Sequence, residues 1–239
     1  NASLSKNNEK YIEDLYKKLH RNGHLKRDCQ RLINQDRNVF AASMISAGDA
    51  DAMVTGITRP FTRCFDDITK VISARKMQTF LSMSMIVSKE RTVFIGDVNI
   101  HDRPSAEQIA DIASGIANTV NNLGYTPRVA LLSFSNFGNP IRPSSKNIRE
   151  AVNILIEREV DFEFDGEMTA EVALNYDLIK ENYPFCRLSD SANVLIMPGL
   201  LSANISFKLL QSLGGGSVLG PIMIGGEKPF QIVQMGSSV

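Results

Sequence analysis

The sequence of 239 residues has few cysteines, no net charge and no long apolar run. Its three cysteines, Cys29, Cys64 and Cys186, are far apart, which fits the reduced thiols of a cytoplasmic protein better than a disulfide framework. Lys plus Arg equals Asp plus Glu at 26 each, so no net field favours nucleic acid or an anionic membrane as a partner. No apolar run approaches the roughly 18–20 residues that would span a bilayer.

Metal and nucleotide motifs are also missing. His20 and His24 supply no helical ligand pair, because Gly23 is predicted to end the helix between them, and we expect no metal site. The glycine-rich segments 213–216 and 225–226 are not followed by Lys-Ser or Lys-Thr, so neither is a P-loop. No G-x-G-x-x-G opens a helix after a strand, so we expect no dinucleotide site in this chain.

The two ends of the sequence carry little information about targeting. The N-terminus is polar and has no apolar signal-peptide core, so no secretory signal is predicted. The chain lacks an initiator Met and stops just after a predicted strand, without a closing helix. We therefore interpret it as a piece of a longer protein.

Alternating strand and helix patterns from residue 80 onward predict an α/β fold. Strands are predicted at 80–87, 92–96, 128–134, 161–164, 193–197, 218–224 and 230–234, and helices at 104–123, 144–159, 168–181 and 201–212. Strand–helix–strand units of this length imply right-handed crossovers and a mainly parallel sheet.

The first part of the chain is instead rich in helices. Helices are predicted at 8–22, 25–34, 37–47 and 58–74, with a short strand at 52–54. We therefore expect two subdomains, the first formed by 1–76 with about 225–239 and the second by 77–224.

Polar residues follow the apolar strand predicted at 128–134. Ser133, Ser135, Asn136 and the backbone around Gly138 offer hydroxyl, amide and N–H groups that suit a phosphate, pyrophosphate or acyl oxygen. The alternative is an ordinary loop of turn-forming residues. The pattern alone does not separate the two.

Two further segments carry candidate residues. Asp165 is predicted to end its strand, where acid–base function is more frequent, whereas Glu167 and Glu171 in the following turn favour a helix-capping role. On the helix predicted at 201–212, Lys208 lies one turn after Asn204, so both side chains can point along one edge. A solvated lysine and a contact to an anionic ligand are the alternatives for Lys208.

Several of these segments belong together. They are VALLSFS at 129–135, DGEM at 165–168, Ala170-Glu171, ANVLI at 192–196 with Pro198, ANI at 203–205, Lys208, Gly220-Pro221 and Lys228-Pro229. In this order they resemble the phosphate acetyl/butyryltransferase family over nearly the whole chain. The segments at 36–42, 48–59 and 135–138 are similar to the version that is fused to the C-terminus of bacterial NADP-dependent malic enzymes.

The resemblance implies a three-layer αβα architecture like that of the isocitrate and isopropylmalate dehydrogenases, with a CoA cleft between two subdomains and a homodimer or higher homo-oligomer. In active transferases the CoA thiol attacks acetyl phosphate, a Ser-Arg pair after the Lys-Pro segment serves the chemistry, and further arginines hold phosphate. At the Ser-Arg positions this chain has Gln234 and Met235, and an arginine expected after Gly56 falls at Asp66. Each such lost donor commonly costs about 10²–10³ in rate.

We therefore predict an acetyl-CoA-sensing regulatory and oligomerisation domain of a malic enzyme that does not itself transfer acetyl groups. NADP and Mg²⁺ or Mn²⁺ are expected only in the catalytic part of the malic enzyme, outside this chain. An active phosphate acetyltransferase and a purely structural oligomerisation module are the alternatives. The ligand-binding residues implied for an acyl-CoA or related small molecule are Arg59, Ser133, Ser135, Asn136, Gly138, Asp165, Asn204 and Lys208.

Overall fold

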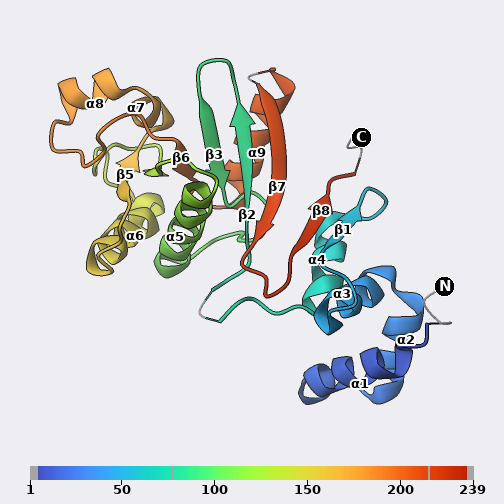
Figure 1. Ribbon diagram of the computed structural model, residues 1–239. Coiled ribbons are helices and arrows are strands. Elements are labelled where there is room, and N and C mark those ends of the chain that lie inside the picture. Colours follow the sequence, from blue (N-terminus) through green and yellow to red (C-terminus); the bar gives the residue numbers. More distant parts are fainter. Residues whose placement is uncertain (1–4, 77, 215, 236–239) are drawn as a thin grey trace. The chain divides into compact units, whose positions relative to one another are not determined.

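The computed structural model describes residues 5–76, 78–214 and 216–235. The chain divides into two compact units (Figure 1). Unit 1 comprises Asn1–Met77 with Gly225–Val239, and unit 2 comprises Gln78–Ile224. None of the helices in the described ranges combines the length and apolar character that crossing a bilayer requires.

Unit 1 consists mostly of helices. Its elements are α1 (Asn8–Leu19), the 3₁₀ turn η2 (His20–Asn22), α2 (Lys26–Gln35), α3 (Arg37–Ala47), β1 (Met53–Gly56), α4 (Phe61–Thr69) and β8 (Phe230–Val233). Asp36 caps α3, because its side chain accepts hydrogen bonds from the backbone N–H groups of Asn38 and Val39. Strands β1 and β8 pair in parallel, although residues 57–229 lie between them in the sequence.

Unit 2 is built on a six-stranded sheet with the order β5-β4-β6-β3-β2-β7. The strands are β2 (Leu81–Val87), β3 (Thr92–Gly96), β4 (Arg128–Leu132), β5 (Glu163–Met168), β6 (Val194–Ile196) and β7 (Ser217–Ile224). The pairs β5–β4, β4–β6 and β6–β3 are parallel, whereas β2 is antiparallel to β3 and β7. The mainly parallel sheet predicted from the sequence is confirmed. The two antiparallel pairs lie at one edge, where a short hairpin joins β2 to β3 and leaves no room for a crossover.

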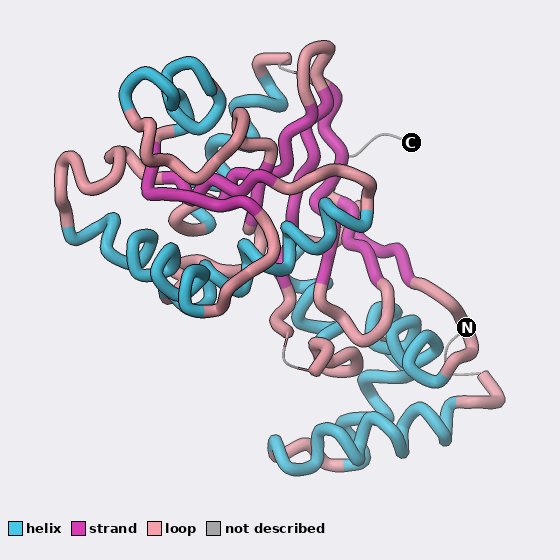
Figure 2. Tube along the Cα trace, turned by 60° about the vertical axis from the view of Figure 1, so that its left-hand side comes forward, coloured by secondary structure: helices cyan, strands magenta, loops and turns pink. Residues whose placement is uncertain are grey.

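Helices cover both faces of this sheet (Figure 2). One face packs against α5 (Ala106–Asn122) and α6 (Lys146–Glu157), with buried residues such as Ile109, Ile116 and Leu155 between them. The other face packs against α7 (Ala170–Leu174), α8 (Tyr176–Asn182) and α9 (Leu200–Ser212). Unit 2 is therefore a three-layer αβα unit whose parallel strands present their carboxyl ends to one edge.

Two predicted elements of unit 2 differ from the structure. The helix predicted at 168–181 is two short helices, because Thr169 caps α7 and Asn175 caps α8 through its own side chain. The strand predicted at 161–164 is β5, which continues to Met168. It continues because the acidic residues beyond Phe164 are buried as ion pairs rather than exposed in a turn.

Candidate functional site

A buried network follows the carboxyl end of β4 in unit 2. Ser135 is 1% exposed, and its hydroxyl donates to Glu167 Oε1 in the neighbouring strand β5. Arg149 Nη1, from α6, lies 3.1 and 3.2 Å from the two oxygens of Glu167 and also donates to Ser145 Oγ at 2.8 Å. Because Glu167 is fully buried, its charge requires these partners. Sequence reasoning favoured a structural role for Glu167 and did not single out Arg149.

The loop after Ser135 is a tight turn. Asn136 and Asn139 exchange backbone hydrogen bonds of 3.0 and 3.2 Å, and the central residues Phe137 and Gly138 have φ values of 49° and 87°. This is the pattern of a type I′ turn, in which glycine relieves the strain of a positive φ. The Asn136 side chain accepts a hydrogen bond from Thr169 N at 2.7 Å. Asn136 and Gly138 therefore have the roles expected of an ordinary turn-forming loop. Ser133 lies beside Ser135, with 3.5 Å between their hydroxyl oxygens.

The placement of Asp165 at the end of its strand was wrong. Asp165 lies inside β5 and is 4% exposed. Its carboxylate accepts hydrogen bonds from Arg187 N at 2.8 Å and Arg187 Nη2 at 3.0 Å. Asp165, Glu167, Arg149 and Arg187 line one cavity of about 510 Å³. Both carboxylates are neutralised by guanidinium groups, so this cavity offers polar hydrogen-bonding groups rather than a poised general base.

A further buried carboxylate, that of Asp97, follows β3. Asp97 is 4% exposed and accepts hydrogen bonds from Ser82 N at 3.0 Å and His101 N at 2.9 Å, while His101 Nδ1 lies 2.6 Å from its Oδ2 atom. Burial raises the pKa of Asp97, but the contacts with His101 and Ser82 outweigh burial and hold this pKa below its ordinary value. No metal-ligand spacing among the histidines points to this pair.

We expect replacement of Asp97 by Asn to lower the unfolding free energy by about 2–3 kcal/mol at pH 7, since it removes charge-assisted hydrogen bonds from a buried site. The folded-state pKa of Asp97 is depressed, so its contribution is present above the ordinary value of 3.8 and lost as pH falls through the folded-state value. Urea unfolding between pH 7 and pH 3 should therefore show the two curves converging in acid. Asp102→Asn, at an exposed site in the same loop, is the matched control. A difference that does not change with pH contradicts this role.

The two candidate residues on α9, Asn204 and Lys208, differ in their exposure to solvent. Asn204 is half-buried, whereas Lys208 is exposed and its Nζ lies 5.4 Å from the centre of the Phe207 ring. Arg59 belongs to unit 1.

In unit 1 the parallel strands β1 and β8 end side by side. Gly56 is paired with Val233, and Ile57 N donates to Val233 O at 3.2 Å. A Cβ atom on Gly56, whose φ is 118°, would lie 2.0 Å from Val233 O, so this approach requires glycine. The segment that leads to Arg59 therefore starts beside the segment that holds Met235, which is 61% exposed.

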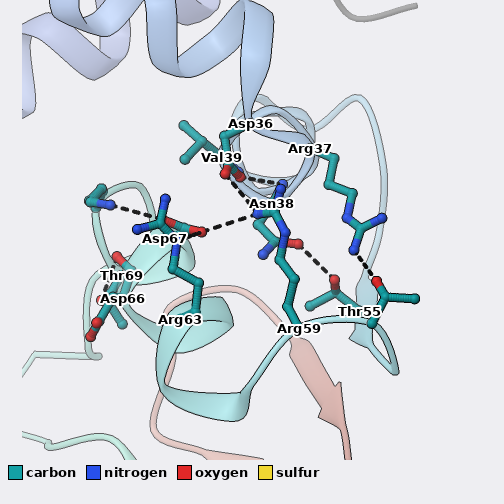
Figure 3. A network of polar contacts seen from close by, with 12 residues as sticks. Asp36, Arg37, Asn38, Val39, Thr55, Arg59, Arg63, Asp66, Asp67 and Thr69 are labelled. Atoms are coloured by element: carbon teal, nitrogen blue, oxygen red, sulfur yellow. Dashed lines mark hydrogen bonds and ion pairs between the residues drawn. The ribbon is translucent and has the colours of Figure 1, made fainter. Parts of the chain in front are cut away.

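Arg59 is held in a charged network of unit 1 (Figure 3). Its Nη1 atom lies 2.7 Å from Asp36 Oδ2 and 3.3 Å from Asp67 Oδ2. Asp67 is fully buried and also contacts Arg63 Nε at 3.1 Å and Lys70 Nζ at 2.9 Å. Burial raises the pKa of Asp36, but Arg59 and the backbone N–H groups at the start of α3 outweigh burial and lower it.

Arg59 thus faces two carboxylates, those of Asp36 and Asp67, and the sequence pattern did not single out Asp67. Asp66, the residue expected near the phosphate position, is exposed. Arg37 donates to Thr58 Oγ1 in the same network. Guanidinium groups suit phosphate because they present parallel N–H donors. Here, however, Arg59 already has two carboxylate partners.

Thiol and metal chemistry have little support in the described ranges. Burial raises the pKa of Cys186 to about 11, so the thiol is protonated near neutral pH and is a poor nucleophile. Cys29 and Cys64 are fully buried. Among residues 5–76, 78–214 and 216–235, no group of three or more His, Cys, Asp or Glu side chains is arranged to hold a metal ion.

Comparison with known proteins identifies the family of this chain. The family model for phosphate acetyl/butaryl transferase matches residues 1–239. The chain is 50% identical over 235 residues to the NADP-dependent malic enzyme of Rhizobium meliloti (strain 1021), covering 98% of this chain and 31% of that protein. It is 34% identical over 250 residues to the phosphate acetyltransferase of Treponema pallidum (strain Nichols), covering 99% and 74%.

A solved structure is similar over the same length. The phosphotransacetylase from Streptococcus pyogenes aligns with a TM-score of 0.92 and 26% identity, covering 100% of this chain and 73% of that one. The chain spans about a third of the length of the malic enzymes that it matches. The family match along the whole chain and the relatives of both kinds lead to one conclusion: this chain belongs to the phosphate acetyl/butaryl transferase family, in the form similar to the phosphotransacetylase-like region of bacterial NADP-dependent malic enzymes.

Proposed function

We propose that this chain is an acetyl-CoA-sensing regulatory and oligomerisation domain of an NADP-dependent malic enzyme and that it does not itself transfer acetyl groups. The observation that carries the proposal is the edge where β1 and β8 end. There Gln234 and the exposed, uncharged Met235 follow β8, in place of the Ser-Arg pair expected for the family. Nearby, Arg59 is bound to the carboxylates of Asp36 and Asp67.

The loss of these groups has a direct electrostatic consequence. A transferase must stabilise the charge that develops on the phosphoryl group, and a fixed guanidinium is suited to this task. Methionine carries no charge, and the carboxylate of Asp67 repels an approaching phosphate. The arginines of this site can still bind an anionic ligand weakly. The site lacks the fixed charge that would stabilise the phosphoryl group during acetyl transfer.

Acetyl-CoA is a suitable effector because it combines phosphate groups with an acyl thioester. Arg63 and Arg37 lie at the network in unit 1, where exposed guanidinium groups suit the phosphates of CoA. The hydroxyl groups of Ser133 and Ser135 and the side chains of Asn204 and Lys208 remain our candidates in unit 2.

The rest of the proposal concerns the longer protein. Under this proposal, malate oxidation, NADP and a divalent metal belong to the two thirds of the malic enzymes that this chain does not match. We also propose that the chain follows the architecture of the isocitrate and isopropylmalate dehydrogenases and acts in the cytoplasm.

Calorimetry with acetyl-CoA tests the sensing function. We expect saturable heat with one site per chain. We expect Arg63→Ala to raise the dissociation constant about tenfold, since a charge-assisted contact to phosphate is lost. Arg31→Ala, an exposed arginine on α2, is the control and should bind as the unchanged chain does. Absence of heat at millimolar acetyl-CoA would leave the structural module as the better account.

A further inference from the structure

Two arginines of unit 2 present unused hydrogen-bond donors to one cavity. Arg149 and Arg187 both line the cavity of about 510 Å³, and every residue that lines it belongs to unit 2. Arg149 contacts Glu167 and Ser145 through Nη1 alone, and the side chain of Arg187 contacts Asp165 through Nη2. Within the described ranges, the other guanidinium N–H groups of both arginines have no hydrogen-bond partner.

Both guanidinium groups are fixed in place by the contacts that they already make. Glu167 is fully buried and Asp165 is 4% exposed, so neither anchoring carboxylate can move away into solvent. The Arg187 guanidinium also lies 4.8 Å from the centre of the Phe164 ring. A side chain that is already ordered loses little conformational entropy when a ligand binds, which favours binding.

The charges around the cavity cancel. Three basic side chains line it together with three acidic ones. The exposed pair of Lys146 and Glu150, whose Nζ and Oε1 atoms are 3.5 Å apart, lies in solvent and contributes little. The cavity therefore does not attract anions by net charge. It favours an anion whose oxygens match the free N–H groups of the two fixed guanidinium groups.

The spacing of the two arginines favours an elongated anion. Their anchoring carboxylates, Asp165 and Glu167, lie two positions apart in β5, which corresponds to roughly 7 Å along the strand. A compact anion such as phosphate reaches one guanidinium at a time. An ion with a carboxylate at each end reaches both, and each planar carboxylate can accept two parallel hydrogen bonds from a guanidinium group.

The rest of the wall suits a short hydrocarbon linker. Phe137 and Val152 also line the cavity. The Phe137 ring is packed against those of Tyr183 and Phe185, with ring centres 5.1 and 4.9 Å apart. This side of the cavity is therefore apolar and fixed, and it offers no hydrogen bond to a polar linker.

We propose that this cavity binds a small organic dianion with a carboxylate group at each end, one held by Arg149 and the other by Arg187. Asp165 and Glu167 are positioning residues that hold the two guanidinium groups. The site is separate from Arg63 of unit 1, which the proposed function assigns to the phosphates of CoA, and it does not rest on that function.

A titration of the chain with succinate, followed by NMR, tests the site. The Nε–Hε signals of Arg149 and Arg187 should shift together and saturably, with a dissociation constant on the order of 1 mM. Propionate, which has one carboxylate, and inorganic phosphate, which is compact, should each bind at least about tenfold more weakly.

Two variants assign the binding to this cavity. Arg187→Gln removes one guanidinium group and should raise the dissociation constant for succinate at least about tenfold. Asn153→Glu leaves both buried ion pairs intact and adds a negative charge at the exposed rim, so it should also weaken binding about tenfold even if Arg187→Gln fails to fold. Asn121→Glu, at an exposed position of α5 away from the cavity, is the matched control and should bind succinate as the unchanged chain does.

Three results would overturn the assignment: no saturable shift with succinate, equal binding of propionate or phosphate, and equal binding of succinate by Asn153→Glu and Asn121→Glu. Acetyl-CoA calorimetry on Asn153→Glu separates this site from the sensing function. Retained acetyl-CoA binding in that variant supports two sites, whereas its loss would show that the cavity is part of the acetyl-CoA site. Failure of the unchanged chain to bind acetyl-CoA would end the sensing proposal and leave the dicarboxylate site standing on the succinate titration.

Discussion

Arg149→Ala should lower the unfolding free energy of this chain by about 3–5 kcal/mol, because it leaves a buried carboxylate without its counter-charge. Glu167 is fully buried, and Arg149 Nη1 contacts both of its oxygens at 3.1 and 3.2 Å. The hydroxyl of Ser135 then remains as a neutral hydrogen-bond donor to this carboxylate. A neutral donor does not compensate a buried negative charge.

Urea unfolding followed by circular dichroism measures this loss. The control is Lys146→Ala on the same helix, whose side chain is exposed, and its effect should stay within about 0.5 kcal/mol. Adding Glu167→Gln to Arg149→Ala should recover part of the stability, since the unpaired charge is then gone. A loss below about 1 kcal/mol for Arg149→Ala would show that the pair does not stabilise unit 2.

Asp67→Ala in unit 1 should lower the unfolding free energy by about 2–3 kcal/mol. Asp67 is the shared partner of Arg59, Arg63 and Lys70, and its removal leaves three cations close together. The loss is smaller than that for Arg149, because these cations are partly exposed and screened by solvent.

Inorganic phosphate provides the specific readout for Asp67→Ala. The freed cations can then bind the anion, so phosphate should raise the melting temperature of the variant more than that of the unchanged chain. Asp66→Ala, the exposed neighbour, is the control and should show neither the loss nor the extra stabilisation. If phosphate stabilised Asp67→Ala and Asp66→Ala equally, the result would contradict the view that the Asp67 carboxylate holds cations that could otherwise bind phosphate.

The sequence predicted those elements whose apolar spacing is regular. Helix α5 was expected at 104–123 and runs Ala106–Asn122, since Ser105 provides a cap and every third or fourth residue faces the core. Strands β2 and β3 were likewise placed within a residue of their ends. These elements form through local propensity and burial, both of which a single sequence displays.

The charged interior could not be predicted in the same way. Asp165 and Glu167 interrupt the apolar pattern of β5, and what keeps them in the strand are Arg187 and Arg149, which are 22 and 18 residues away. The spacing of apolar residues does not indicate which arginine forms an ion pair with which acidic residue far away in the sequence. The same holds for Asp67, because one position along α4 separates the buried acid from an exposed one.

Equilibrium dialysis of acetyl-CoA against this chain in phosphate buffer, followed by mass analysis of the recovered ligand, tests the central claim most directly. The account predicts that acetyl-CoA is retained by the protein and recovered intact, because the phosphoryl-stabilising charge is missing at Met235. Recovery of free CoA with acetyl phosphate, or no retention of acetyl-CoA at all, would contradict it.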